Sequence, residues 1–559
     1  MVILRVAFFV LAFFLLQQLP AQVIPAGFPV LEESMRRKSL HGETSYSFLL
    51  RSGLPLEIPG DSIERSLKKP RKNEIGILPF LIKARGVSDR PYGWGDYGMI
   101  PNPGFQSYVS GGMYISLGGF HLTLRPELVL AQNLGFETDL NSFSPSEVFD
   151  RFLLWNIGDV PERFGDGPLV APWWGQSKLT FQVGAFEIGA STQNLWWGPG
   201  QWNSLTFSNN AQGFPHLTLN TRRPAKTFLG NFEGQLLLGR LRDSGFAPSQ
   251  DEGLNQRFFW QFSGDWRYLN AVTISFSPKW VEGLSMGFSR THHVYNDTRG
   301  NTFYDWFPIF EGFQKKKFFT NGNTVEYDAN GRSQQFTIFG RWVIQQTKSE
   351  IYFEYGRRDH AFNWRDFTMT PEHARAYILG FNQLVEIPNW KNHLQIRGEM
   401  TQQQESINRI TRYLGISGGY TWHTHGLARG FANRGQPLGV GIGTGANVQN
   451  LELALVDGVN KKGIVLERLV NNQDYYYRAL FQFSQRKPWI DYSLGLLYDR
   501  QFGDLLFSTK LQVIHARNYQ WQLDPLSTPE FPRGRNLTSV LGQVNAVYFW
   551  NRGNGRARE

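Results

Sequence analysis

Apolar and polar residues alternate with a period of two through most of the chain from residue 77 onward. The alternation is clearest at residues 112–117, where Met113, Ile115 and Leu117 are separated by small or polar residues. Gly118-Gly119 follows and favours a two-residue turn, after which the alternation resumes. Each such strand has one apolar and one polar face. The pattern therefore predicts an all-β protein.

The same alternation recurs far along the chain, and the polar faces carry charge. Further examples lie at residues 350–355, 491–499 and 507–513. A soluble sandwich would turn its apolar faces towards a second sheet, whereas a barrel in lipid turns them outward. Strands of about 9–11 residues that recur in this way favour a transmembrane antiparallel outer-membrane β-barrel. We therefore expect four charged residues to face a wet lumen: Arg125, Glu127, Glu350 and Glu354.

One segment departs from this period and predicts a helix over residues 144–156. Ser144 is suited to the N-cap, Pro145 to the first turn, and Glu147 completes a capping box. Apolar residues then follow at helical spacing. A helix between strands cannot lie in the barrel wall, so we expect a small helical plug in the lumen or at its mouth. A helix on a surface loop is the alternative.

The ends of the chain predict where the protein is exported to and where its segments begin and end. Residues 1–21 combine a short basic start, an apolar run and a small residue near Ala21, as a signal peptide does. We expect a periplasmic segment at 22–76, the barrel at 77–550 and a short tail at 551–559. No later stretch approaches the length of about 18 apolar residues that a membrane helix needs.

The amino-acid composition further limits the class of protein to which the chain can belong. Aromatic residues make up 15% of the chain, glycine occurs 58 times and cysteine is absent. A mean hydropathy of -0.36 excludes a helical-bundle membrane protein but not a barrel with a polar interior. The net charge of +10 does not indicate nucleic acid, because the basic residues are interleaved with acids and the protein is exported.

Residues 193–233 have an unusual composition of tryptophan, amide and arginine side chains around a Gly-Pro-Gly turn. Such a loop suits a ligand that stacks and hydrogen-bonds, such as a sugar. The alternative is an aromatic belt that anchors a barrel in the bilayer, with the arginines facing water. The candidate polysaccharide-binding residues are Trp196, Trp197, Trp202, Asn209, Asn210, Arg222 and Arg223.

Several motifs in this stretch and beyond it resemble the Wzi family of capsule-assembly outer-membrane proteins. They are Asn-Leu-Trp-Trp-Gly-Pro-Gly at 194–200, Ser-Asn-Asn-Ala at 208–211, Gly-Phe-Pro at 213–215, Pro-Glu-His-Ala-Arg-Ala-Tyr at 371–377 and Asn-Arg-Gly-Gln at 433–436. The chain length alone gives about 16–20 strands, and the resemblance implies about 18. It also implies a non-catalytic, lectin-like barrel that holds capsular polysaccharide at the cell surface.

Catalytic and metal chemistry find little support in the sequence. There is no Gly-x-Ser-x-Gly nucleophile elbow and no phosphate-binding glycine loop. His423 and His425 alternate and could share a metal, but no third ligand is evident. Glu372-His373 is more simply a structural hydrogen bond than an acid–base pair. We therefore expect no enzyme activity, no metal and no cofactor.

Two functional hypotheses remain open at this stage. The first is an occluded barrel that binds surface polysaccharide, and the second is a porin or substrate-specific channel with the same strand pattern. A barrel enzyme is a third and weaker reading. In each case we expect a monomer in the outer membrane of a Gram-negative bacterium, in contact with outer-membrane lipid, inserted by the barrel assembly machinery and without nucleic acid.

Overall fold

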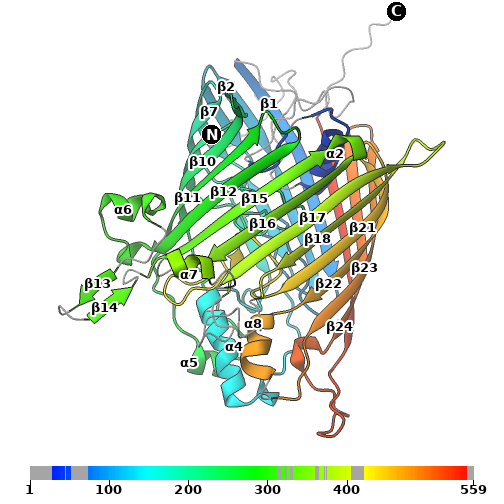
Figure 1. Cartoon of the computed structure of the whole chain (residues 1–559). Coiled ribbons are helices and arrows are strands. Elements are labelled where there is room, and N and C mark those ends of the chain that lie inside the picture. The colour runs from blue at the N-terminus through cyan, green and yellow to red at the C-terminus, as the bar shows by residue number, and fades with distance from the viewer. Residues whose placement is uncertain are drawn as a thin grey trace, which may run out of the picture.

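A closed antiparallel β-barrel dominates the computed structural model (Figure 1). The structure describes residues 28–44, 46–51, 73–312, 317–320, 324–327, 331–358, 364–369, 372, 374–404, 421–481 and 484–550. The expected signal peptide at 1–21 and the tail at 551–559 lie outside the described residues. Among the described helices, none has the length and apolar character of a membrane span.

The wall consists of 21 sheet elements in chain order. The first of these are β1 (Asn73–Val87), β2 (Gly104–Leu117), β3 (Phe120–Leu124), β4 (Glu127–Ala131), β5 (Leu169–Trp173), β6 (Lys178–Val183), β7 (Phe186–Ser191), β8 (His216–Thr221), β9 (Ala225–Lys226), β10 (Gly230–Leu241) and β11 (Arg267–Pro278). The others are β12 (Leu284–Tyr295), β15 (Ser333–Ile344), β16 (Ser349–Arg358), β17 (Arg375–Glu386), β18 (His393–Gln402), β21 (Asn447–Asp457), β22 (Asn460–Val470), β23 (Ile490–Phe502), β24 (Leu505–Arg517) and β25 (Leu537–Tyr548).

These elements form 18 barrel strands. Three of the 21 elements continue the element before them as one strand: β4 continues β3, β6 continues β5, and β9 continues β8. The pairings show this, since β2 pairs with both β3 and β4, β5 and β6 pair with β4 and β3, and β10 pairs with both β8 and β9. Removing three from 21 leaves 18, and the pairing of β1 with β25 closes the barrel. The strand number implied by the family resemblance is confirmed. β1 begins at Asn73, before the start at residue 77 that the alternation predicted.

The two ends of the barrel differ in their connections. Short turns, such as Gly118-Gly119 between β2 and β3, lie at the end where β1 begins and β25 finishes. Long connections lie at the other end, at residues 88–103, 192–215 and 403–446 among others. Outer-membrane barrels carry short periplasmic turns and long extracellular loops. The upper end in Figure 1 is therefore periplasmic and the lower end extracellular.

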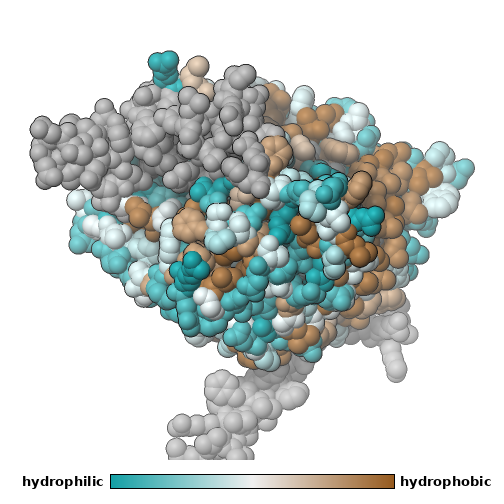
Figure 2. Space-filling model, turned by 90° about the horizontal axis from the view of Figure 1, so that it is seen from below, coloured by the Kyte–Doolittle hydropathy of each residue, from teal (hydrophilic) through white to brown (hydrophobic). Residues whose placement is uncertain are grey.

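The alternating side chains face the directions that the sequence predicted, with apolar residues outward and polar residues inward. Ile351 and Phe353 are exposed on the outer wall, whereas Glu350 and Glu354 on either side of them are buried inside. The exposed outer row continues on other strands through Phe120, Leu179, Leu217, Leu379, Leu453, Leu494, Leu511 and Val544. Seen from the extracellular end, hydrophilic side chains dominate the visible loop surface and hydrophobic ones gather on the flank of the barrel (Figure 2). Lipid is thus the solvent of the outer wall.

Helices and short hairpins occupy the connections. The α-helices are α2 (Pro29–Leu40), α4 (Pro145–Gly158), α5 (Glu252–Phe258), α6 (Phe303–Trp306), α7 (Trp364–Met369) and α8 (Gln473–Tyr475). The shorter helical turns are η1 (Leu140–Ser142), η2 (Asn296–Thr298), η3 (Pro308–Phe310), η4 (Gln345–Thr347), η5 (Tyr476–Leu480) and η6 (Tyr519–Trp521). Two hairpins complete the set: β13 (Lys317–Thr320) with β14 (Thr324–Tyr327), and β19 (Ala432–Asn433) with β20 (Gln436–Pro437).

The helix predicted from the Ser144 capping box is α4. Glu147 N donates to Ser144 Oγ and Ser144 N donates to Glu147 Oε2, so both halves of the box are formed. The helix ends at Asp159, which adopts the left-handed conformation. Figure 1 shows α4 at the extracellular mouth of the barrel, one of the two positions expected for it.

Replacement of Ser144 by alanine should loosen the first turn of α4. Loss of this cap removes the acceptor of one helix N–H, and such a loss costs about 1 kcal/mol. Hydrogen exchange at the amide of Glu147 should become faster, while exchange in the wall strands stays unchanged. Unchanged exchange at Glu147 would show that the hydroxyl does not hold the turn.

The N-terminal segment does not form a separate periplasmic portion as far as it is described. Residues 28–44 and 46–51 lie inside the upper end of the barrel, where α2 is surrounded by wall strands (Figure 1). Arg36 of α2 pairs with Glu350 of β16 at 3.2 Å, and Glu33 pairs with Arg397 of β18 at 2.6 Å. The expectation for 22–76 missed this, because polar contacts with distant strands hold the segment in place.

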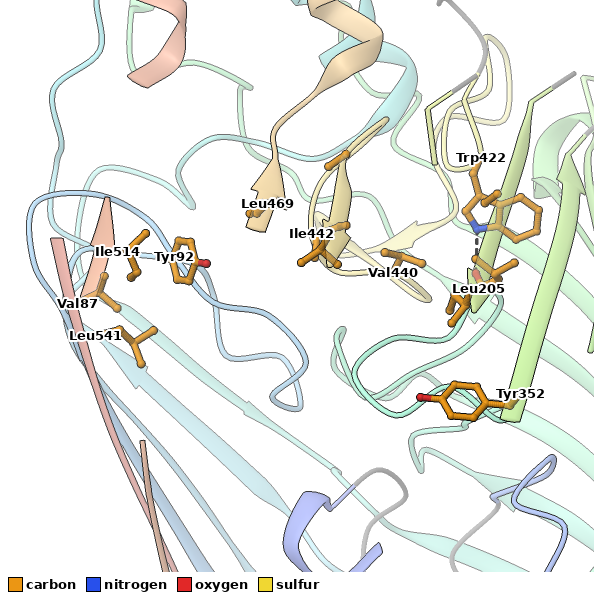
Figure 3. Close-up of a cluster of buried hydrophobic side chains, with 14 residues drawn as sticks. Val87, Tyr92, Leu205, Tyr352, Trp422, Val440, Ile442, Leu469, Ile514 and Leu541 are labelled. Carbon is orange, nitrogen blue, oxygen red and sulfur yellow. Dashed lines mark hydrogen bonds between the residues drawn. The ribbon is translucent and has the colours of Figure 1, made fainter. Parts of the chain in front are cut away.

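The interior of the barrel is packed rather than water-filled along much of its length. A buried cluster joins wall residues such as Val87 and Tyr352 to loop residues such as Leu205 and Ile442. Figure 3 shows this cluster reaching from one side of the wall to the other, with Trp422 Nε1 donating to the carbonyl of Leu205 at 2.8 Å. The expectation of a wet lumen is wrong at these levels, since inward-folded loops fill the space.

Candidate functional site

The Trp-Trp-Gly-Pro-Gly stretch lies inside the barrel and is clamped to its wall. Glu354 of β16 accepts hydrogen bonds from the backbone N–H of Gly200 at 3.0 Å and of Leu205 at 2.8 Å. Glu399 of β18 accepts from the backbone of residues 201–203, at 2.5 Å from Gln201 N and 2.9 Å from Asn203 N. We call residues 192–215 the Trp loop. Two wall carboxylates therefore bind the tip of this loop.

The N-terminal segment holds the Trp loop from the opposite side. Arg51 Nη2 donates to the carbonyl of Gly200 at 2.7 Å and to that of Gly198 at 3.1 Å. Arg36 donates to the carbonyl of Pro199. Backbone hydrogen bonds also join Arg51 to Trp196 and Gly198 to Leu49. The glycines are required by this packing, since a Cβ at Gly200 would lie 2.0 Å from the carbonyl oxygen of Asn203.

Two of the tryptophans named as candidate polysaccharide-binding residues are buried. Trp196 and Trp197 are 2% and 1% exposed. Arg51 stacks over the ring of Trp196 at 4.6 Å, and Trp197 Nε1 donates to Gln235 of β10 at 2.9 Å. Asn210 donates to the carbonyl of Pro437 at 2.9 Å. These side chains join the Trp loop to the N-terminal segment, to the wall and to a neighbouring loop, so they do not form an exposed contact surface.

Arg222 and Arg223 lie apart from the tryptophans. β8 runs between them and the Trp loop, and its periplasmic end places both arginines beside the β6–β7 turn. Arg222 Nη1 donates to Gln182 at 2.8 Å and its Nε donates to the carbonyl of Gly184 at 3.2 Å. A six-residue strand spans about 20 Å, so the sequence-predicted group of seven residues is not one site.

The four charged residues expected in the lumen do face inward, but each is engaged by protein. Arg125 Nε donates to Ser110 at 3.1 Å, and Glu127 accepts from Gln176 at 3.0 Å. Glu350 accepts from Arg341 Nε at 2.6 Å and lies 3.2 Å from Arg36. With Glu354 bound to the Trp loop, these charges serve the internal packing.

A polar cavity of about 190 Å³ remains inside the barrel, between α2, the Trp loop and wall strands β21–β25. Trp196, Trp202 and Asn209 line it, so the structure brings three of the predicted residues together here. Arg397 stacks over the Trp202 ring at 4.3 Å. Lys510 also lines the cavity. The cavity shows that the lumen keeps some polar space despite the plug.

The extracellular mouth carries an exposed aromatic and cationic surface that the sequence analysis did not single out. Trp260 is 45% exposed and follows α5, and Phe149 of α4 is exposed nearby. Arg257 lies on the exposed side of α5 and stacks over Phe258 at 4.9 Å. Phe149 and Phe258 meet edge to face at 6.3 Å. We call Phe149, Arg257, Phe258 and Trp260 the Trp260 platform.

Buried polar groups fix the backbone beneath this platform. Asn156 of α4 accepts from the backbone N–H of Trp260 at 3.0 Å and donates to the carbonyl of Phe258 at 2.9 Å. Arg429 Nη2 donates to the carbonyl of Trp260 at 2.6 Å. An exposed ring on a rigid support loses little conformational entropy when it binds a ligand. The Gln-Arg-Phe-Phe-Trp-Gln run at 256–261 was the signal available in the sequence.

The histidines considered as metal ligands have other surroundings. His425 Nδ1 accepts from the backbone N–H of Ala428 at 2.9 Å. Burial lowers the pKa of His423 to about 3, so this ring is neutral at physiological pH. No group of three or more His, Asp or Glu side chains positioned for a metal occurs within the described ranges. Glu372 pairs with Arg375 at 2.7 Å, and His373 lies outside the described residues.

Comparisons with known proteins identify relatives of this barrel. A family model for the capsule assembly protein Wzi matches residues 76–454. No curated protein matches the chain. The solved structure of Wzi from Escherichia coli, an outer-membrane carbohydrate-binding β-barrel involved in group 1 capsule assembly, is similar with 11% identity and a TM-score of 0.57. The alignment covers 94% of this chain and 99% of that protein.

Two further solved structures match this chain with lower TM-scores. OprD from Pseudomonas aeruginosa matches with 7% identity and a TM-score of 0.36, over 84% of this chain and 92% of that one. OpdQ from the same organism gives 10% identity and a TM-score of 0.38, over 85% of this chain and 97% of that one. Similarity at this level reflects the general barrel architecture.

Proposed function

Because the chain belongs to the Wzi family of capsule assembly proteins, we propose that it binds capsular or surface polysaccharide at the outer face of the outer membrane and retains the polymer there. The contact surface is the Trp260 platform. An exposed indole ring stacks on the apolar face of a sugar, and an exposed guanidinium beside it binds hydroxyl or carboxylate groups. The observation that carries the proposal is the exposed Trp260 at the extracellular mouth, whose backbone Asn156 and Arg429 hold and which follows the exposed Arg257 by three residues.

The charge of the molecule supports an acidic polymer. Arg257 has no ion-pair partner in the part of the chain that the structure describes, and the whole chain has a net charge of +10. An uncompensated cation on an exposed surface attracts an anionic ligand over distances of about 10 Å at moderate salt. Uronate-containing polysaccharides have the required charge and ring faces.

The internal contacts support a role without catalysis. Glu350 and Glu354, the nearest pair of acids on one strand face, are occupied by arginines and by backbone N–H groups. A carboxylate that holds a loop in this way has no access to a substrate. The filled lumen also favours retention over transport, since loops and α2 lie where a channel would run.

Deletion of the gene tests the function as a whole. Cells without the protein should make normal amounts of polysaccharide but release most of it into the medium, because synthesis does not depend on the barrel. Polymer in the cell and medium fractions would be measured after gentle washing. Polymer that stays cell-bound in the deletion strain would refute the proposal.

Replacement of Trp260 by alanine tests the binding surface. Loss of one stacked ring costs about 1 kcal/mol, so affinity for the host polysaccharide should fall roughly five- to tenfold. Binding would be measured on immobilised polymer with the purified protein. Trp280→Ala is the matched control, since Trp280 is 67% exposed but lies in the β11–β12 turn at the periplasmic end. Equal affinities of the two variants would exclude the platform as the contact.

A further inference from the structure

A second hollow lies on the outside of the barrel and is unrelated to the platform. It has a volume of about 490 Å³ and is lined by residues of β3, β6, β7, β8, β10 and β11. Its floor is apolar, with Leu122, Leu179, Leu217 and Leu238. Its rim carries Trp174, Trp266 and Trp306 together with Arg240. We call this hollow the outer groove.

The outer groove exists because the wall strands on this side of the barrel are short. β7 has six residues and β8 has six before the two-residue β9, whereas β10, β11 and β12 have 12 each. Six residues rise about 20 Å along the strand and less across the membrane once tilted, against an apolar band of about 25 Å in such barrels. Beyond Ser191 the chain turns inward as the Trp loop, and this turn leaves a notch beside the taller strands.

The groove faces lipid and lies towards the extracellular leaflet. Leu217 on its floor is 58% exposed on the outer wall. Arg240 is next to the last residue of β10 at the extracellular end of that strand. α6 packs outside the wall here, as Figure 1 shows, and the hydroxyl of Tyr268 on β11 donates to the carbonyl of Trp306. Exposed tryptophans at this height are typical of the membrane interface.

The rim is positively charged and not neutralised by protein. Arg240 is exposed, stacks over Trp266 at 5.1 Å and has no acidic partner among the described residues. Arg299 lies next to the same tryptophans, with its guanidinium 3.5 Å from the centre of the Trp306 ring. Its buried Nε and Nη1 atoms lack hydrogen-bond partners in the described part of the chain. Lys178 faces the barrel interior, where it pairs with Glu187 at 3.0 Å. A lone arginine beside lipid is best satisfied by an anion.

We propose that the outer groove binds one lipid of the outer leaflet through its acyl chains and a phosphate on its headgroup. The chains occupy the leucine floor, which would otherwise leave an unfilled notch against the bilayer. The phosphate accepts hydrogen bonds from the guanidinium of Arg240, the side chain with the geometry for bidentate phosphate binding. The tryptophans hold the headgroup level at the interface.

The test uses the full-length protein in a mild neutral detergent, with bis-phosphorylated lipid A as the probe. After exchange and washing, native mass spectrometry should show one lipid A per protein, and Arg240→Ala should weaken binding at least tenfold. Arg500→Ala is the matched control, because Arg500 is also exposed on the outer wall but lies near the periplasmic end of β23. Its binding should equal that of the unmodified protein.

Further comparisons fix the chemistry of the ligand. Dephosphorylated lipid A should bind at least tenfold more weakly. Heat-modifiable migration on gels confirms that each variant is folded, and Arg240→Gln replaces Arg240→Ala if the latter is not. Equal retention by the Arg240 and Arg500 variants, or equal retention of the phosphate-free lipid, would overturn the proposal.

Discussion

Simultaneous replacement of Glu354 and Glu399 by alanine is expected to release the Trp loop and open the barrel. These two carboxylates accept the backbone N–H groups of Gly200, Leu205 and residues 201–203. A buried hydrogen bond contributes about 0.5–1.5 kcal/mol net, and a buried donor that is left without its acceptor costs about 1–3 kcal/mol. Even with strong non-additivity, the loop should lose about 5 kcal/mol of stabilisation.

The measurement is ionic current through the purified protein in planar lipid bilayers. The unmodified barrel should give no steady conductance, because the Trp loop and α2 interlock across its interior through Arg51 and Arg36. The double variant should conduct, at least intermittently. The wall itself should persist, since its strand ladders do not depend on these side chains.

Glu187→Ala provides the matched control for this experiment. Glu187 is also a buried, inward-facing glutamate, but it binds Lys178 and Asn220 and does not contact the Trp loop. This variant should remain silent. A folded Glu354/Glu399 double variant that is as silent as the control would show that other loops, not the clamp, close the barrel. A current from the unmodified protein would instead favour the channel hypothesis.

The wall could be predicted from the sequence because its pattern is local. Two-residue alternation around Ile351 and Phe353 depends only on neighbouring residues, and so does the Gly118-Gly119 turn. The capping box of Ser144 and Glu147 likewise acts within one helical turn. These features need no knowledge of distant partners, so the strands, the hairpins and α4 agree with the structure.

The interior could not be predicted, because distant residues determine it. The Trp loop folds inward through partners such as Glu354, which is 154 positions from Gly200. An aromatic, amide-rich loop has the same sequence pattern whether it faces solvent or a carboxylate on the barrel wall. β8 then carries Arg222 away from that loop, a separation that composition cannot show. Trp260 is 45% exposed and also lies among aromatic and amide residues, so composition alone does not separate it from the buried tryptophans.

Acidification is expected to weaken the attachment of α2 to the barrel wall, because it protonates Glu33. This carboxylate lies 2.6 Å from Arg397 and 2.8 Å from Lys461. Burial alone would raise its pKa, but Arg397, Lys461 and Arg37 outweigh burial and hold the pKa of Glu33 at about 2, below its ordinary 4.5. A depressed carboxyl pKa stabilises the fold above pH 4.5, and this stabilisation is lost as the pH falls towards 2.

The variant Glu33→Gln separates this effect from the titration of other acids. At neutral pH it should unfold more easily than the unmodified protein, by up to about 3 kcal/mol. The difference between the two proteins should shrink between pH 4.5 and about 2, because protonation makes Glu33 neutral in both. Glu386→Gln, which removes an exposed pair with Lys348 in the β17–β18 turn region, should change nothing measurable. A difference between Glu33→Gln and the unmodified protein that is the same at neutral pH and at about pH 2.5 would mean that packing, not charge, seats α2.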